Sequence, residues 1–314
     1  MAYRRKKSNK GLSIVLALIA FLFVIGGALY ASNEDVRNFV DSYLGTPTTK
    51  APGVPPIDPN GEEMAVHFID VGQGDCTLLQ TPDGSVLVDC GEPDKGDDII
   101  AYLESVGVTE LEYFIITHPH DDHMGSAAYV LRNITVKNFV INGQQRTTKF
   151  FEEALDVVEE KGINGIIASP TDTENNLFQI GALQLRILGP YKDYGDDYNN
   201  ASLIIHAIYG ERSFLLTGDA EKKAEEEFLK YHANEIKCDV FAAGHHGSRT
   251  SNTAELLAAA RPTYVVISCG EGNDYNHPNQ EALDNFADIG AKVYRTDLVG
   301  SVVFITDGKT LTKK

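Results

Sequence analysis

From residue 64 to residue 312, short apolar runs alternate with longer stretches in which apolar residues recur every three or four positions. Short apolar or alternating runs are typical of strands, and the wider spacing is typical of amphipathic helices. The pattern predicts strands at 64–71, 111–118, 136–143, 182–190, 202–210, 212–219, 238–246, 262–270, 292–296 and 300–306. It predicts helices at 97–108, 124–133, 148–162, 220–233, 251–260 and 279–290.

Two turn signals add hairpins to this pattern. Residues 76–91 contain two apolar runs joined at Asp83-Gly84, and the sequence Tyr-Gly-Glu-Arg at 209–212 joins two further strands. Turns of this kind between apolar runs are typical of β-hairpins. Strands mixed with helices over one long body predict an α/β (α+β) fold in which two sheets carry helices on their outer faces.

The N-terminal segment predicts attachment to a membrane. Residues 12–31 carry no charge over 20 positions, which is about the length that crosses a bilayer. The basic residues in the tail at 1–11 favour an orientation with this tail in the cytoplasm and the rest of the chain outside the cell. We interpret the segment as an uncleaved transmembrane signal anchor. The alternative is a signal peptide cut near Gly26 or Ala28, which would release a secreted protein.

Residues 32–63 are predicted to form an extracellular, proline-rich linker. A short polar helix is predicted at 33–44, and five prolines follow between residues 46 and 59. Because proline neither continues a helix nor pairs in a central strand, the proline-rich stretch is expected to be an extended, semi-rigid tether. The folded body then occupies residues 64–312.

The charge of the chain limits its partners. The net charge is -18, and the first ten positions hold five of the 27 Lys and Arg residues, which leaves 22 basic against 45 acidic residues beyond them. Such a body repels the phosphates of nucleic acid at long range. A nucleic-acid substrate would therefore need local cations or metal ions at its binding site.

The cysteines do not resemble a zinc knuckle, because none of the four belongs to a CxxC pair. Cys76 and Cys90 flank the predicted hairpin turn symmetrically. They form either a disulfide, which the predicted export would permit, or two small buried thiols, which is the interpretation that we prefer.

The strongest chemical signal is the stretch Thr-His-Pro-His-Asp-Asp-His-Met-Gly at 117–125. It holds three of the chain's nine histidines and two aspartates. Imidazole and carboxylate ligands together suit zinc, manganese or iron. The stretch therefore predicts a metal site.

The local geometry divides these side chains into two pairs. A predicted strand ends at His118 and Pro119 keeps the backbone extended, so His118 and His120 project to the same side. Asp122 and His123 follow where the next helix is predicted to begin. Two pairs so close together predict two divalent transition metals, zinc or manganese, which polarise a phosphoryl or carbonyl oxygen and generate a hydroxide nucleophile.

Further ligands are predicted at the ends of other strands. Asp219 ends one predicted strand, and His245 with His246 ends another. An apolar strand that ends abruptly in Asp or His holds a ligand on a rigid sheet edge. For Asp219, the alternative is an N-cap of the following helix. Asp89 also ends a strand, from which it could orient a ligand histidine.

These motifs resemble the metallo-β-lactamase superfamily, whose members have a four-layer αββα sandwich with a two-metal site at the sheet edge. More narrowly, they resemble the hydrolase domain of ComEC-like DNA-uptake competence proteins. Seven motifs in the same order carry this resemblance, at 68–76, 117–126, 199–205, 214–220, 244–251, 267–270 and 275–283. The resemblance runs from about Phe68 to Ser301 and implies such a hydrolase domain at 64–312, preceded by the single membrane helix.

The resemblance also implies a role for each ligand. His118 and His120 would bind one metal, Asp122 and His123 would bind the other, and Asp219 would bridge the two. Asp122 and Asp219 are accordingly the predicted catalytic residues.

One histidine of the pair His245 and His246 would complete the site of the second metal. We prefer His245, because it comes first after the strand, and His246 would then face the substrate. Asp89 would support the site from outside the ligand set.

One departure from the superfamily pattern concerns the region before the Gly-Asp at 218–219. Many members place another metal-binding histidine there, whereas this chain has Asn199, Asn200 and Ser202, as the ComEC-like group does. His206 lies further along the strand and is interpreted as structural. The departure argues against a true β-lactamase and predicts a less fully ligated first metal.

Other residues are candidates for substrate contact. The glycine-containing loop at 71–75, which ends in Asp75, offers either amides for a phosphate or only a tight turn. His277 either contacts the substrate or lies in a simple turn. Ser248 and Arg249 could receive a phosphate oxygen.

These observations predict a membrane-anchored, extracytoplasmic metal-dependent hydrolase, a phosphodiesterase or DNase that uses a metal-activated hydroxide on a phosphodiester such as DNA. The alternatives are hydrolysis of carboxyl esters, lactones or lactams, and hydrolysis of a cell-envelope phosphodiester. A non-catalytic binding module is a further alternative, which the complete ligand set argues against. No stable protein partner is predicted.

Overall fold

The computed structural model describes residues 57–58 and 61–314. The predicted membrane segment at 12–31, the predicted helix at 33–44 and most of the predicted linker lie outside the described residues. Among the residues that are described, no helix has the length and hydrophobicity that crossing a bilayer demands.

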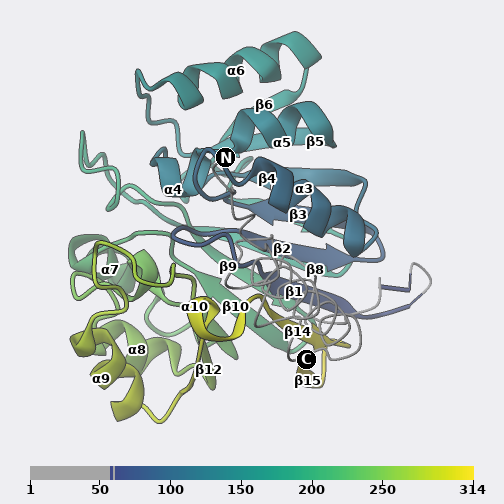
Figure 1. Ribbon diagram of the computed structural model, residues 1–314. Coiled ribbons are helices and arrows are strands. Elements are labelled where there is room, and N and C mark those ends of the chain that lie inside the picture. The colour runs from purple at the N-terminus through teal and green to yellow at the C-terminus, as the bar shows by residue number, and fades with distance from the viewer. Residues whose placement is uncertain (1–56, 59–60) are drawn as a thin grey trace, which may run out of the picture. The chain divides into compact units, whose positions relative to one another are not determined.

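One sheet has the strand order β15-β14-β1-β2-β3-β4-β5-β6 (Figure 1). The strands from β3 to β6 are parallel, and the others are antiparallel to their neighbours. The bounds of these strands are β1 (Met64–Phe68), β2 (Thr77–Thr81), β3 (Gly84–Val88), β4 (Glu110–Ile115), β5 (Thr135–Ile141), β6 (Asn164–Ile167), β14 (Val302–Thr306) and β15 (Leu311–Lys313).

The other sheet has the order β13-β12-β11-β10-β9-β8-β7. The strands from β10 to β13 are parallel, and β7, β8 and β9 are antiparallel to their neighbours. The bounds are β7 (Leu177–Ile180), β8 (Leu183–Gly189), β9 (Ile204–Tyr209), β10 (Arg212–Leu216), β11 (Val240–Ala242), β12 (Tyr264–Ile267) and β13 (Lys292–Arg295).

Helices form the two outer layers (Figure 1). The first sheet is covered by α3 (Gly96–Ser105), α5 (Ala127–Asn133) and α6 (Lys149–Lys161), and the second by α7 (Lys222–His232), α8 (Ala254–Ala260) and α9 (Gln280–Asp288). Large buried apolar clusters fill the space between each pair of layers. The order helix, sheet, sheet, helix confirms the predicted αββα sandwich.

Alternate residues of a strand face two different cores. In β10, Phe214 and Leu216 pack between the two sheets, while Leu215 packs against the outer helices. Successive side chains of a strand point to opposite faces, so a continuous apolar run buries both faces of the sheet. Each fully buried side chain of this size stabilises the fold by roughly 1.5–3 kcal/mol.

Five short elements were not expected from the hydrophobic pattern. They are the strands β6, β7 and β15 and the helices α4 (Asp121–Met124) and α10 (Thr296–Val299). Each spans three or four residues. A segment this short completes no more than about one helical turn or two strand repeats, so its periodicity is not readable.

All four cysteines are free and buried. The Cys90 thiol donates a hydrogen bond to the carbonyl oxygen of His123 (3.3 Å). Burial raises the pKa of both the Cys76 and the Cys90 thiol well above the usual value. The preferred interpretation of two buried thiols is therefore confirmed.

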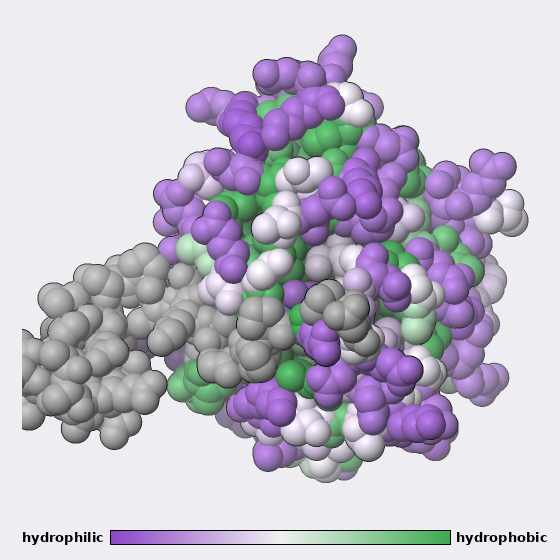
Figure 2. All heavy atoms as spheres, turned by 90° about the vertical axis from the view of Figure 1, so that its right-hand side faces the viewer, coloured by the Kyte–Doolittle hydropathy of each residue, from purple (hydrophilic) through white to green (hydrophobic). Residues whose placement is uncertain are grey.

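Hydrophilic residues predominate on the face shown in Figure 2, and hydrophobic residues appear there in separate areas between them. Exposed large apolar side chains come from several different elements, for example Ile167 of β6, Leu177 of β7 and Leu298 of α10. Apolar residues scattered in this way are normal on a protein surface.

We expect the variant His67→Phe to be less sensitive to acid than the parent protein. His67 is fully buried in β1, where its Nδ1 lies 3.1 Å from the Tyr102 hydroxyl. Burial lowers its pKa from 6.5 to about 4. Between these values only the unfolded state binds the proton, so stability falls as the pH falls, by about 2 kcal/mol between pH 7.5 and pH 5. Urea unfolding at both pH values measures this loss, and an equal loss in the variant would contradict the prediction.

Candidate metal centre

The candidate site lies where strands of both sheets end. Asp89 follows β3 and His118 follows β4, which are parallel neighbours in the first sheet. Asp219 follows β10, and His245 and His246 follow the parallel strand β11. Carboxyl ends of parallel strands meet at one edge and commonly form ligand sites.

The short helix α4 adds Asp122 and His123 to this edge. Its position depends on Gly74, because the Asp75 amide donates to the Asp122 carbonyl oxygen (3.1 Å), and a Cβ atom on Gly74 would lie 2.3 Å from that oxygen. Gly74 also has a φ of +127°, which residues with side chains rarely adopt. The loop at 71–75 is thus a tight turn that supports α4, which favours the structural alternative over phosphate binding.

His118, His120 and Asp219 form the first group of potential metal ligands, with ligand atoms within 4.8 Å of one another. His118 Nε2 lies 2.9 Å from His120 Nδ1 and 3.7 Å from Asp219 Oδ2. Asp219 is not the N-cap of α7, because that position belongs to Glu221. The alternative of a helix cap is therefore excluded.

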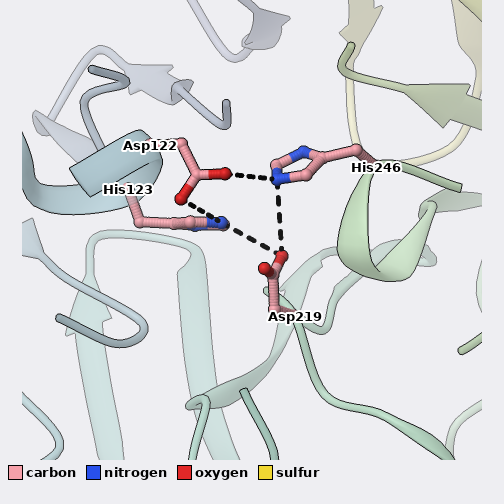
Figure 3. A group of neighbouring side chains, drawn as sticks. All are labelled: Asp122, His123, Asp219 and His246. Atoms are coloured by element: carbon pink, nitrogen blue, oxygen red, sulfur yellow. Dashed lines mark hydrogen bonds and ion pairs between the residues drawn. The ribbon is translucent and has the colours of Figure 1, made fainter. Parts of the chain in front are cut away.

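Asp122, His123, Asp219 and His246 form the second group, also within 4.8 Å of one another (Figure 3). His123 Nε2 is 3.0 Å from Asp219 Oδ1 and 4.0 Å from Asp122 Oδ1. His246 Nε2 is 3.1 Å from Asp122 Oδ2 and 3.6 Å from Asp219 Oδ1. Asp219 belongs to both groups and turns one oxygen toward each, as a shared ligand of two metals would.

Asp89 holds His123 from outside the second group. Its Oδ2 lies 2.8 Å from His123 Nδ1 and accepts a hydrogen bond from the Thr117 hydroxyl, and its Oδ1 accepts one from the Thr117 amide. Asp89 also has a positive φ of 59°, a conformation that persists only where the surroundings require it. This is the orienting position predicted for Asp89.

Hydrogen-bonding groups also fix the ring orientations of His118 and His246. Ser202 Oγ lies 3.2 Å from His118 Nδ1 and accepts a hydrogen bond from the Asp219 amide (3.1 Å). His246 Nδ1 donates to the carbonyl oxygen of Ser268 (3.0 Å). In each case the outer nitrogen is engaged, so Nε2 is the atom that faces the other potential ligands.

Electrostatics in the second group favour a cation. Burial alone would lower the pKa of His123, but Asp219, Asp89 and Asp122 outweigh it and hold that pKa well above the usual value. The pKa of His246 is raised in the same way, against burial and chiefly by Asp219. Without a metal, protons on these imidazoles offset the carboxylates, at the place where a metal ion would.

The donor atoms themselves also fit a metal. His123 Nε2 and Asp219 Oδ1 are buried, and among the described residues neither has a well-formed hydrogen bond. An ion bound between them would satisfy both atoms. Burial and the neighbouring His123 lower the pKa of His118 well below its usual value, which favours the neutral imidazole that a metal requires.

His246 rather than His245 completes the second group, so the preference drawn from the sequence is reversed. The strand β11 ends at Ala242, and both histidines lie in the short turn η1 (Gly244–Gly247) with φ values of 52° and 53°. The positive φ values reverse the direction of the chain at this point, and His246 contacts Asp122. Both histidines line the cavity, but His246 is only 1% exposed, whereas His245 is 21% exposed.

The predicted residues at 199–202 differ in what they contact. Asn199 lines a cavity beside the metal groups, and its Oδ1 is buried without a hydrogen bond to any described residue. Asn200 instead joins its loop to α7, because it donates to Asp197 (2.9 Å) and accepts from the Ala224 amide (3.1 Å). Asn200 therefore supports this loop and does not line the cavity.

Ser248 and Arg249, the residues predicted to receive a phosphate oxygen, are not brought to the cavity. The Ser248 hydroxyl lies 3.0 Å from the Thr250 hydroxyl, and the Arg249 amide donates to Asn279 (2.9 Å). The Arg249 guanidinium lies 3.8 Å from Glu281. After the turn at η1 the chain leads away from the metal groups, and neither residue lines the cavity.

A cavity of about 360 Å³ opens beside both groups. His277 lines it, together with Gln73, Arg146 and Tyr275, which sequence reasoning did not single out. Gln73 and Tyr275 lie inside the motifs at 68–76 and 275–283. Arg146 lies in the loop between β5 and α6, five residues after the strand ends, so the strand-end rule for Asp and His does not indicate it.

Comparison with known proteins agrees with this geometry. Residues 69–271 match the family model of the metallo-beta-lactamase superfamily. The matched range contains every residue of both ligand groups. The chain belongs to the metallo-beta-lactamase superfamily. Within this superfamily, it is similar to ComEC-like competence proteins.

"ComE operon protein 3" of Bacillus subtilis (strain 168) is 33% identical over 260 residues, which cover 77% of this chain and 33% of that protein. "Competence protein ComA" of Neisseria gonorrhoeae is 29% identical over 243 residues, which cover 77% of this chain and 32% of that protein. The chain therefore spans about a third of the length of these relatives.

Two solved structures share the fold. The metallo-beta-lactamase fold protein YhfI from Bacillus subtilis has a TM-score of 0.52 at 14% identity and covers 77% of this chain and 100% of its own. CmlA, a diiron beta-hydroxylase from Streptomyces venezuelae, has a TM-score of 0.51 at 14% identity and covers 82% of this chain and 55% of its own. Together, the superfamily fold and the His/Asp cluster support a metal-dependent hydrolase.

Proposed function

We propose that the protein is a membrane-anchored, extracytoplasmic phosphodiesterase with a two-metal site. One observation carries the choice of substrate class. Both ligand groups adjoin a cavity in which Arg146 is the single Lys or Arg among the described lining residues. A guanidinium binds the oxygens of an anionic phosphodiester, whereas a neutral ester or lactone offers it no charge.

Arg146 is held at the cavity wall by two contacts. Its Nη1 donates to the carbonyl oxygen of Pro119 (2.9 Å), and its guanidinium carbon lies 4.9 Å from the centroid of the Tyr198 ring. It forms no ion pair with any described carboxylate, in a chain that has far more acidic than basic residues. Its remaining N–H groups are therefore available to a phosphate oxygen beside His120, which lines the same cavity.

Two divalent transition metals, zinc or manganese, would supply Lewis-acid stabilisation of the phosphate and a nucleophile from water at neutral pH. The first group would hold one metal and the second group the other. Asp122 is 20% exposed and lines the cavity, whereas Asp219 is 2% exposed. Both carboxylates line the cavity, and Asp122, as the more exposed of the two, is the one that can orient a water molecule.

His277 is placed to contact the substrate within the same cavity. It lines the cavity, and burial is the largest cause that lowers its pKa to about 4. The imidazole is thus neutral at pH 7. Its Nδ1 is buried and has no hydrogen-bond partner among the described residues, so Nε2 is the nitrogen that we propose contacts a substrate oxygen in the cavity.

We expect Arg146→Ala to raise KM for bis-p-nitrophenyl phosphate by roughly 10- to 100-fold, because a hydrogen bond to a charged group contributes about 1.5–3 kcal/mol. Metal content should stay the same. Arg132→Ala, which removes a cation from the exposed side of α5, is the matched control and should leave the kinetic constants unchanged.

The same assay distinguishes the alternatives. An unchanged kcat/KM for the phosphodiester in Arg146→Ala would count against the proposal. Faster hydrolysis of a chromogenic lactam or a p-nitrophenyl ester by the parent protein would favour carbonyl chemistry instead.

A nucleic-acid strand is the phosphodiester that the neighbouring surface favours. A second cavity of about 630 Å³ is lined by Tyr191, Tyr194 and Tyr198. The Tyr198 ring contacts His120 at 5.7 Å between ring centroids, so the two cavities adjoin. Aromatic faces next to a cation suit the bases and backbone of a single strand.

Similarity to competence proteins supports the same choice, while the net charge of -18 opposes long-range attraction of DNA. Rates on linear single-stranded DNA, a cyclic dinucleotide and bis-p-nitrophenyl phosphate test it. DNA cleaved no faster than the model compound would favour a small or cell-envelope phosphodiester.

Membrane attachment is the remaining part of the proposal and rests on the uncharged segment at 12–31 and the basic tail before it. Expression of the full chain followed by membrane fractionation tests it. Recovery of the intact protein in the soluble fraction would contradict the anchor, and recovery of a shortened chain in the medium would identify a signal peptide.

A further inference from the structure

The first ligand group is smaller than the second. It contains His118, His120 and Asp219, and Asp219 is shared with the other group. A catalytic zinc typically has three protein ligands of its own. Ser202, in the region where many superfamily members have an additional histidine, contacts His118 Nδ1 from behind and is not a ligand.

His245 lies next to this group, outside the 4.8 Å limit that defines it, and follows a strand of the other sheet. Its Nε2 lies 3.6 Å from Asp219 Oδ2, and His118 Nε2 lies 3.7 Å from the same oxygen. His123 and His246 instead approach the other oxygen, Oδ1, at 3.0 Å and 3.6 Å. The four imidazoles thus divide into two pairs across one carboxylate.

The outer nitrogen of His245 is engaged as in a metal-binding histidine. His245 Nδ1 lies 3.4 Å from Glu221 Oε1 and 3.3 Å from the Thr250 hydroxyl. A carboxylate behind Nδ1 fixes the tautomer and the ring orientation of a metal ligand and leaves Nε2 for the metal. Asp89 has the same relation to His123.

The backbone conformation explains how the consecutive residues His245 and His246 approach different oxygens of Asp219. His245 and His246 both have positive φ, a conformation that costs roughly 1–3 kcal/mol for each residue other than glycine. Their rings are 6.1 Å apart and inclined by 74°. The turn therefore points one imidazole to each oxygen of Asp219.

We propose that His245 is a ligand of the first metal, together with His118, His120 and Asp219, and that Glu221 orients it. His245 and His246 then each serve a different metal. The inference rests on the proposed two-metal site but not on the proposed substrate.

The test is metal binding, measured by calorimetric titration of the metal-free protein with Mn²⁺ or Zn²⁺ and by metal content after gel filtration. The variant His245→Asn is the most suitable, because asparagine tolerates positive φ better than most residues and is too short to replace the imidazole. We expect two sites in the parent protein. In the variant one site should remain, and the other should weaken by at least about 100-fold, since even orienting residues contribute 10- to 100-fold.

Two further variants make the result specific. Glu221→Gln should weaken the same site by roughly 10-fold. His277→Ala removes a histidine whose ring lies 5.3 Å from that of His245 in the same cavity, and it should retain both sites.

The outcomes separate this inference from the proposed function. Two unchanged sites in His245→Asn would overturn the inference alone, as would an equal loss in His277→Ala. Fewer than two sites in the parent protein would overturn the two-metal proposal itself. Circular dichroism melting of each variant shows whether a lost site reflects a lost fold.

Discussion

Replacing Asp219 by asparagine is expected to lower hydrolysis by roughly a thousandfold or more and to weaken both metal sites at once. Asp219 is the residue common to the two ligand groups, with Oδ1 near His123 and Oδ2 near His118. Asparagine keeps the shape of the side chain but removes the negative charge and one of the two acceptor oxygens. The charges of His123 and His246 hold the pKa of Asp219 well below its usual value, against the effect of burial, so the ionised form is the one that the site is built around.

The measurements are kcat/KM on a phosphodiester and metal content of the purified variant. Asp307→Asn is the matched control, because Asp307 also follows a strand, β14, but at the opposite sheet edge, where Thr306 pairs with Met64 at the start of β1. The control should retain activity and both metals. Full activity in Asp219→Asn, or loss of only one metal, would show that Asp219 does not bridge.

Removal of metal is expected to abolish activity and also to destabilise the fold. A ligand that binds only the folded state stabilises it by about 3–4 kcal/mol at 100 to 1,000 times its dissociation constant. For a body of this size that corresponds to a melting temperature lower by roughly 5–15 °C. Stability is expected to fall rather than rise, because the carboxylates of Asp89 and Asp219 are buried and a bound cation offsets their charge.

Dialysis against a chelator, followed by thermal melting and by return of two equivalents of metal, measures both effects. Mg²⁺ serves as a control ion, because it prefers oxygen ligands to imidazole. Activity that survives in protein shown to be free of metal would contradict the two-metal assignment, and so would a melting temperature that zinc or manganese does not raise.

Much of the site was predictable because one physical rule repeats. An apolar strand that ends in Asp or His delivers that side chain to the sheet edge, and this identified Asp89, His118 and Asp219 before the sheets were known. The αββα order was predictable for a similar reason, because continuous apolar runs such as the one before Asp219 require burial on both faces of a strand.

Other features were beyond the reach of the sequence. The roles of His245 and His246 depend on two consecutive positive φ values, which reverse the direction that an extended strand would give. Asn200 and Ser248 looked like site residues because of their neighbours, yet their hydrogen bonds lead into the surrounding loops. Short polar strands such as β6 carry too few apolar positions to produce a readable period.

Asp219 and His246 follow strands of one sheet and His118 and His123 follow β4 of the other, which has a consequence for how the protein folds. Each ligand group takes residues from both the earlier and the later half of the folded body. Neither half can bind an ion in this way by itself. The metals would thus act as cross-links between the two halves of the sandwich. Metal binding would then occur only after both halves have folded and packed against each other.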